Sequence, residues 1–200
     1  MLHVMLRLVR IALLSLTSAA FILAAACGDD DEEPAATTPA PTASEEPTPT
    51  EAPFSGARDP VIATPQPAFM TALLSDIQTA EEDGFDRITF EYTFAIPGFD
   101  IRYVEPPIIY DPRGDPMEIE GSAFIVIRME PAAGHDPNTG ASTYVGPLEL
   151  KPALPSILEA ERVGDFEGVF SWALGLSEEA DFRVLTLEDP LRLIIDVAHP

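Results

Sequence analysis

A segment of 26 residues without any large apolar side chain, residues 28–53, limits where this chain can fold. It contains no Val, Ile, Leu, Met, Phe, Tyr or Trp. Because nothing in it can be buried to offset the entropy of ordering, we expect it to be disordered. Prolines continue to interrupt the chain up to Pro67. We therefore place a disordered, acidic, Pro/Thr/Ala-rich tether at residues 27–67. A folded domain follows at residues 68–200, which is long enough for a hydrophobic core.

The first 26 residues have the parts of a secretory signal peptide. Arg7 and Arg10 precede an apolar run of 16 residues, and small residues lie just before Cys27. A membrane-spanning helix needs about 20 apolar residues, so this run is short for a span. A basic start, a short apolar run and a small-residue cleavage site instead predict an export signal at residues 1–26.

The segment LAAACG at 23–28 resembles the lipobox of bacterial lipoproteins, with Ala24 where that pattern most often has leucine. The resemblance implies that Cys27 is the lipid-modified first residue of the mature protein and carries acyl chains such as palmitate. The chain would then be an extracytoplasmic lipoprotein anchored to the bacterial cell membrane. An ordinary signal peptide with an incidental cysteine, or an uncleaved anchor, is the alternative. Cys27 is the only cysteine, so its modification leaves none for a disulfide.

The charge of the chain restricts its partners. The formal net charge is −23 at pH 7, and residues 54–200 carry 26 acidic side chains against nine basic ones. Such a surface repels nucleic acid and anionic lipid headgroups, so we expect no nucleic-acid partner. The negative charge fits a domain that the tether holds away from the membrane so that it can act at a distance from the lipid. A tether that is only a generic spacer, with no function beyond clearance, fits equally well.

From residue 68 onward, short apolar segments alternate with turn-forming residues. Residues 85–94 and 99–105 alternate between apolar and polar side chains, as half-buried strands do. Residues 122–131 are apolar on both faces, which predicts a central strand. Residues 69–80 and 156–166 fit either helix or strand, whereas 106–121 and 132–142 are predicted loops. Seven to nine strands without βαβ alternation predict an all-β fold, an antiparallel sandwich or barrel.

Five segments in order resemble the AMIN-like domain of bacterial exported proteins, a relative of the AMIN domain. They are GFDRITFEY at 84–92, PGFDIRYVEPP at 97–107, GHDPNTGASTYVGPLELKP at 134–152, VGDFEGVFSWALGL at 163–176 and FRVLTLEDPLRLIIDV at 182–197. The pattern Asp-Pro-x-Arg-Leu-x-x-Asp at 189–196 is the part shared most widely with AMIN itself. The resemblance implies a β-sandwich and a non-catalytic role in targeting to the cell envelope, through peptidoglycan or other wall polymers.

The sequence offers little for catalysis or for a metal. His135 and His199 are the only histidines after the leader, and neither belongs to a Ser-His-Asp or zinc motif. Asp136, Asn138 and Gly140 have the alternate spacing of a calcium loop, but Asp and Asn also favour turns by bonding their own backbone. With so many acidic residues, pairs at the spacing of a glycosidase arise by chance. We predict no catalytic residue, no metal and no cofactor.

Two residues are candidates for ligand binding: Tyr144, expected to be an exposed aromatic, and Arg192. Arg192 and Asp196 lie four residues apart on one face of the last strand, about 13 Å from each other, so each must pair across strands. Arg87 and Asp86 are the expected partners in a structural ion pair; contact with a sugar is the alternative. Trp172 fits core packing better than sugar stacking.

The sequence thus predicts a lipid-anchored envelope protein that is not an enzyme. Its leading function is to bind a cell-wall polymer such as peptidoglycan or another polysaccharide. The second possibility is a scaffold that docks another envelope protein through an open sheet edge. A hydrolase that depends on acidic residues is a third.

Overall fold

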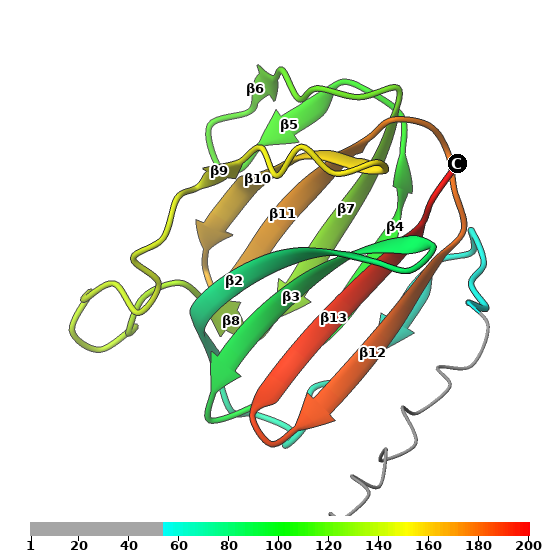
Figure 1. Cartoon of the computed structure of the whole chain (residues 1–200). Helices are drawn as coiled ribbons and strands as arrows, with labels where there is room; N and C mark the ends of the chain where they lie inside the picture. The colour runs from blue at the N-terminus through cyan, green and yellow to red at the C-terminus, as the bar shows by residue number, and fades with distance from the viewer. Residues whose placement is uncertain (1–53) are drawn as a thin grey trace, which may run out of the picture. The chain divides into compact units, whose positions relative to one another are not determined.

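The alternating segments form two β-sheets packed face to face in the computed structural model, which describes residues 54–200 (Figure 1). One sheet has six strands, in the order β1 (Val61–Ala63), β4 (Gly98–Val104), β7 (Ala123–Glu130), β11 (Val169–Leu176), β10 (Ile157–Phe166) and β9 (Glu149–Leu150). The other has five, in the order β12 (Phe182–Glu188), β13 (Leu191–Ala198), β3 (Phe85–Thr93), β2 (Ala72–Glu82) and β8 (Ala132–Ala133). A short pair, β5 (Ile108–Tyr110) and β6 (Asp115–Met117), stands apart from both sheets.

This architecture confirms the predicted all-β sandwich. All neighbouring strands are antiparallel except β2 and β8, which pair in parallel. The two segments that fitted helix or strand are strands β2 and β10. The described residues form no helix, so none of them lies in a helix long and apolar enough to cross a membrane. There are more strands than expected because several are only two or three residues long.

Strand β7 confirms the prediction of a central strand with two apolar faces. It pairs with β4 on one side and β11 on the other. Ile125 and Ile127 face the interior and are completely buried. Phe124 and Val126 face outward and pack in a second cluster with Ile108 of β5. The pair β5–β6 therefore lies over the outer face of the six-stranded sheet, where it covers apolar surface.

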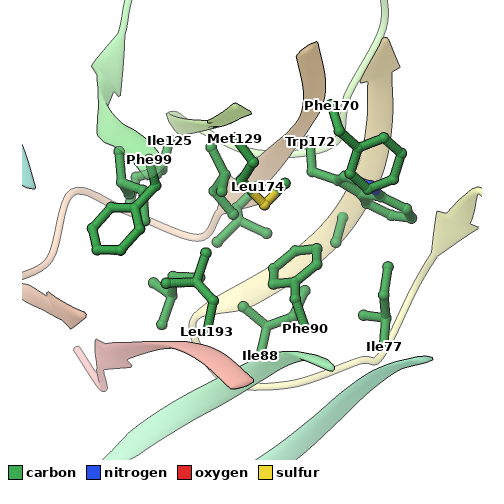
Figure 2. Packing of buried hydrophobic residues seen from close by; sticks show 14 of the residues in the cluster. Ile77, Ile88, Phe90, Phe99, Ile125, Met129, Phe170, Trp172, Leu174 and Leu193 are labelled. Atoms are coloured by element: carbon green, nitrogen blue, oxygen red, sulfur yellow. The ribbon is translucent and has the colours of Figure 1, made fainter. Parts of the chain in front are cut away.

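The core is centred on aromatic side chains from both sheets. Trp172 of β11 is completely buried, as predicted, and meets Phe90 of β3 edge to face with ring centroids 5.9 Å apart. Phe170 contacts the same indole at 6.4 Å. Figure 2 shows Ile88 and Phe90 facing the side chains of the opposite sheet. Edge-to-face aromatic pairs add about 0.5–1.5 kcal/mol to the free energy from burial alone.

The structure differs from the predicted tether boundary at residue 67. Val61 and Ala63 pack against the core, and β1 pairs with β4. Ala57 also exchanges backbone hydrogen bonds with Phe182 of β12. The proline content of this stretch suggested a continuation of the tether, but its few apolar residues are enough to hold it on the sandwich. The predicted leader, Cys27 and the remaining tether lie outside the described residues.

Asp86 joins the two sheets at one end of the sandwich. Its carboxylate is completely buried, and Oδ2 accepts hydrogen bonds from the backbone N–H groups of Ser156 at 2.6 Å and Ile157 at 2.8 Å. Its other oxygen lies 2.8 Å from Nε2 of His199. The side chain comes from β3 of one sheet, and the two donors lie at the start of β10 in the other.

We predict that Asp86→Ala lowers the free energy of unfolding by about 2–4 kcal/mol, because it leaves two buried N–H donors without an acceptor. Urea denaturation of the full-length chain measures the change. Asp83→Ala removes an exposed carboxylate three residues away and is the matched control. Equal denaturation midpoints for the two variants would show that the Asp86 contacts do not stabilise the fold.

Candidate functional site

The two predicted loops, 106–121 and 132–142, meet at a cleft of about 450 Å³. The first loop contains β5 and β6, which lie beside β10 and β11 (Figure 1). Strand β10 and the segment after the second loop complete the walls. The lining residues are Tyr110, Asp111, Pro112, Gly134, His135, Ser142, Tyr144, Gly146, Leu148, Arg162, Asp165 and Phe170.

A close backbone approach fixes the first loop to β10. The N–H of Asp111 donates to the carbonyl of Val163 over 2.9 Å. A Cβ on Gly164 would lie 3.0 Å from the Asp111 carbonyl oxygen, a tight contact that glycine avoids. Glycine at this position lets the loop lie against the strand and form one wall of the cleft.

A β-bulge in β10 places two charged side chains in the cleft together. Arg162 pairs with Trp172, and Asp165 pairs with Phe170, with a register shift between Arg162 and Gly164. Trp172 and Phe170 both face the interior, so Arg162 and Asp165 lie on that same side of the strand. Without the extra residue, two positions three apart would face opposite sides.

Asp165 organises the second wall. One carboxylate oxygen, Oδ2, accepts a hydrogen bond from the Gly134 N–H at 3.2 Å and lies 3.0 Å from Nδ1 of His135. Only 10% of the Asp165 side chain is exposed. Its other oxygen, Oδ1, is buried and has no hydrogen-bond partner among residues 54–200. Asp165 therefore holds this wall through Oδ2, while Oδ1 is enclosed by the protein.

Arg162, which lines the same cleft, also has a buried polar atom without a partner within residues 54–200. Its Nε is buried, and the described part of the chain gives it no acceptor. Buried polar atoms are nearly always paired with protein or solvent, and leaving one unpaired costs about 1–3 kcal/mol. Arg162 and Asp165 therefore line the cleft, and each keeps one buried polar atom without a protein partner in the described residues.

Two arginines change the chemistry of Tyr110 at the mouth of the cleft. The Arg113 guanidinium lies 4.5 Å from the centre of the Tyr110 ring. Hydrogen bonding by Arg113, with a further contribution from Arg162, lowers the pKa of the Tyr110 hydroxyl against the opposing effect of partial burial. Two arginines therefore act on one hydroxyl at this cleft, although the chain as a whole is strongly negative.

Tyr144 lines the cleft, but the prediction that it is an exposed aromatic is wrong. Only 7% of the residue is exposed, and its ring meets Trp172 edge to face at 6.3 Å. Its hydroxyl donates to the carbonyl of Pro147 over 2.8 Å. The Tyr144 ring packs against the edge of the core. Its position in a Gly/Pro-rich loop of the sequence did not indicate this burial. Its role in ligand binding stays a prediction.

Arg192 lies elsewhere, on the outer face of the five-stranded sheet. Its Nε donates to the Glu91 carboxylate on the neighbouring β3 over 3.1 Å. The structure therefore does not bring Arg192 together with Tyr144, which contacts the interior. A structural ion pair accounts for Arg192, and its contact with a ligand stays a prediction.

The same outer face confirms the expected partner of Asp196. Arg87 donates to its carboxylate through both Nε and Nη2, at 2.7 and 2.9 Å, and Arg183 donates through Nε at 2.8 Å. Asp196 is completely buried beneath them. Asp86 was the other expected partner, but it faces the opposite side of β3 and joins the two sheets instead.

The calcium-like loop uses its acidic residue in a turn. Oδ1 of Asp136 accepts a hydrogen bond from the Asn138 N–H over 2.8 Å. That bond is the main cause of the lowered pKa of Asp136. Across residues 54–200, no group of three or more His, Cys, Asp or Glu side chains is placed to hold a metal ion. The turn interpretation of this loop therefore fits the structure.

Sequence reasoning missed Tyr110, Arg162 and Asp165 as cleft residues. A usable signal was present, because charged residues interrupt an otherwise apolar β10. Strict alternation would place Arg162 and Asp165 on opposite faces of β10. The β-bulge places them on the same face, and the only sequence signal for that bulge is the pair Val163-Gly164. Loop 106–121 carried no pattern that indicated contact with β10.

A model of the AMIN-like domain family matches residues 72–199. The match extends from β2 through β13 and includes both walls of the cleft. No curated protein matches the chain well enough to count as a relative.

The environment of Tyr110 predicts an early step in an alkaline titration. Burial raises the pKa of Tyr92, Tyr103 and Tyr144 above the ordinary value of 10.0, while the arginines lower that of Tyr110. Because the chain has four tyrosines, the first phenolate to appear should be Tyr110. Difference absorbance of the folded chain measures this. Tyr110→Phe should remove the first step, and an unchanged first step would contradict the assignment.

Proposed function

The chain belongs to the AMIN-like domain family, and on this premise we propose that it is a non-catalytic module that binds a cell-wall polymer. Membership of this family indicates a targeting or binding role at the cell envelope, outside the cytoplasm. The finer statement, that the ligand is peptidoglycan or another wall polysaccharide, is the proposal. It rests on the cleft between loops 106–121 and 132–142.

The observation that carries the proposal is the set of polar and charged side chains that line the cleft, which includes Tyr110, His135, Ser142, Arg162 and Asp165. A sugar hydroxyl both donates and accepts a hydrogen bond, so adjacent hydroxyls suit a cleft lined by a donor such as Arg162 and an acceptor such as Asp165. The cleft volume of about 450 Å³ lies within the range of about 300–1,000 Å³ typical of ligand sites. Phe170 and Leu148 supply apolar surface beside these polar atoms.

Binding fits the cleft better than catalysis does. The pair His135 and Asp165 has the geometry of a base with its orienting carboxylate. Ser142 also lines the cleft, but no hydrogen bond joins it to His135 within the described residues. Among residues 54–200, the lack of a hydrogen bond between Ser142 and His135 supports binding rather than catalysis in this proposal.

We predict that Ser142→Leu weakens retention on isolated bacterial cell walls by about tenfold or more, because a larger apolar side chain occupies the cleft and cannot bond to a polar ligand. Cosedimentation of the full-length chain with walls measures retention. Thr139→Leu changes an exposed residue of the same loop outside the cleft and is the control. Equal loss in both variants would contradict binding at the cleft, and release of soluble wall fragments would contradict a non-catalytic function.

The membrane attachment is a separate part of the proposal. The lipobox-like segment supports lipid modification of Cys27, and the low-apolar segment 28–53 would separate the domain from the bilayer. We predict that Cys27→Ser shifts the protein from the membrane fraction to the soluble fraction and abolishes incorporation of labelled palmitate. Retention of Cys27→Ser in membranes without label would instead indicate an uncleaved anchor.

Protein docking is the second candidate function, and the edge strand β12 favours it. This strand has seven residues and pairs with β13, and Ala57 bonds to its outer edge only at Phe182. Leu185 and Leu187 are more than 40% exposed on its outer side. An exposed edge with apolar side chains can accept a strand of another protein. A chain that sediments with one envelope protein and not with isolated walls would favour this candidate.

A further inference from the structure

Two arginines of residues 54–200 differ from the other basic side chains because they form no ion pair with a carboxylate. Residues 54–200 contain nine basic side chains. Seven of them form ion pairs with carboxylates, as expected in a domain with a large excess of acidic residues. These seven are Arg58, Arg87, Arg102, Arg128, Lys151, Arg183 and Arg192.

The two arginines that form no ion pair within this part of the chain are Arg113 and Arg162, and both are at the cleft. Arg162 lines it from β10, and Arg113 stacks on Tyr110 at its mouth. They come from segments almost 50 residues apart in the chain, yet both act on the Tyr110 hydroxyl. Asp111 also lines the cleft without pairing with either guanidinium.

We propose that the cleft recognises an anionic oxygen group, a carboxylate or a phosphate, carried by the wall polymer and bound by Arg162 and Arg113. The inference rests on the proposed function and narrows its ligand. A guanidinium binds either group through two parallel N–H···O bonds, and such charge-assisted bonds are about twice as strong as neutral ones. The Tyr110 hydroxyl, between the two arginines, is placed to donate a further hydrogen bond.

The opposite wall suits the uncharged part of the same ligand. Asp165 binds His135 and the Gly134 N–H through Oδ2 and places a carboxylate in this wall of the cleft. A second anionic group would be repelled from this side, whereas a hydroxyl or amide N–H could donate to Asp165. The cleft is therefore divided into an anion-binding end and a hydroxyl-binding end, which suits an acidic sugar or a sugar phosphate.

Long-range electrostatic attraction cannot bring an anionic polymer to this negatively charged chain. The net charge of −23 repels an anionic polymer at distances up to the screening length, about 8 Å at physiological ionic strength. Attraction has to come from groups within hydrogen-bond distance of the ligand. Two arginines without carboxylate partners provide that attraction locally, and a polymer without an anionic group would gain nothing from them.

Cosedimentation of the full-length chain with three wall preparations tests the inference. The first is untreated, the second has its carboxylates amidated with a carbodiimide, and the third has its phosphodiester-linked polymers removed with hydrofluoric acid. We expect one treatment to reduce binding by about tenfold or more and the other to leave it unchanged. Loss after amidation identifies a carboxylate, and loss after hydrofluoric acid identifies a phosphate.

Variants then assign the effect to the cleft. Arg113→Gln alters an exposed side chain and keeps the fold, and Arg162→Gln removes the charge inside the cleft. Each should reduce binding to untreated walls by about tenfold. Arg128→Gln, in which the lost arginine is paired with Glu130, is the control and should bind normally.

The outcomes are distinguishable. Retention on untreated walls that neither treatment nor either cleft variant reduces would overturn this inference and leave the proposed function standing. Loss on treatment without loss in the variants would place the anion site elsewhere and also overturn it. Failure to bind any untreated wall would overturn the proposed function and this inference together.

Discussion

The cleft depends on the packing of Trp172 and Phe170 against the opposite sheet. Their burial fixes which side of β11 faces the interior, and the antiparallel register transfers that choice to β10. The bulge after Arg162 then adds one residue, so that Arg162 and Asp165 both lie on the interior side. Moving either aromatic residue out of the core would turn the charged pair away from the cleft. Core packing and ligand geometry are therefore one constraint in this part of the molecule.

The Asp196 cluster and the cleft differ in whether their charged side chains are paired within the protein. On the outer face of the five-stranded sheet, Asp196 is buried but receives three donors from Arg87 and Arg183. That cluster is closed, with its charges compensated inside the protein. At the cleft, Arg162 and Asp165 each keep a buried atom without a partner. The contrast separates an ion cluster that is fully paired within the fold from cleft residues that are only partly paired within the described residues.

The fold was largely predictable because alternation and turn residues report strand faces directly. Ile88, Phe90 and Tyr92 face the interior, and Trp172 packs in the core, as expected. The site was much less predictable. The bulge in β10 breaks the alternation on which strand prediction relies, and the contact of loop 106–121 with Val163 is a backbone contact that side-chain patterns do not encode. Tyr144 was misjudged because its neighbours in sequence are loop residues, while its neighbours in space are Trp172 and Pro147.

The attachment of residues 54–63 has a mechanical consequence. Phe54 stacks with the Arg183 guanidinium, Ala57 bonds to Phe182 on the edge of one sheet, and β1 then pairs with β4 on the edge of the other. A pulling force that enters the domain at residue 54 is thus divided between both sheets before it reaches any core strand. These first residues therefore tie the edges of the two sheets together, and their loss would remove contacts at both edges at once.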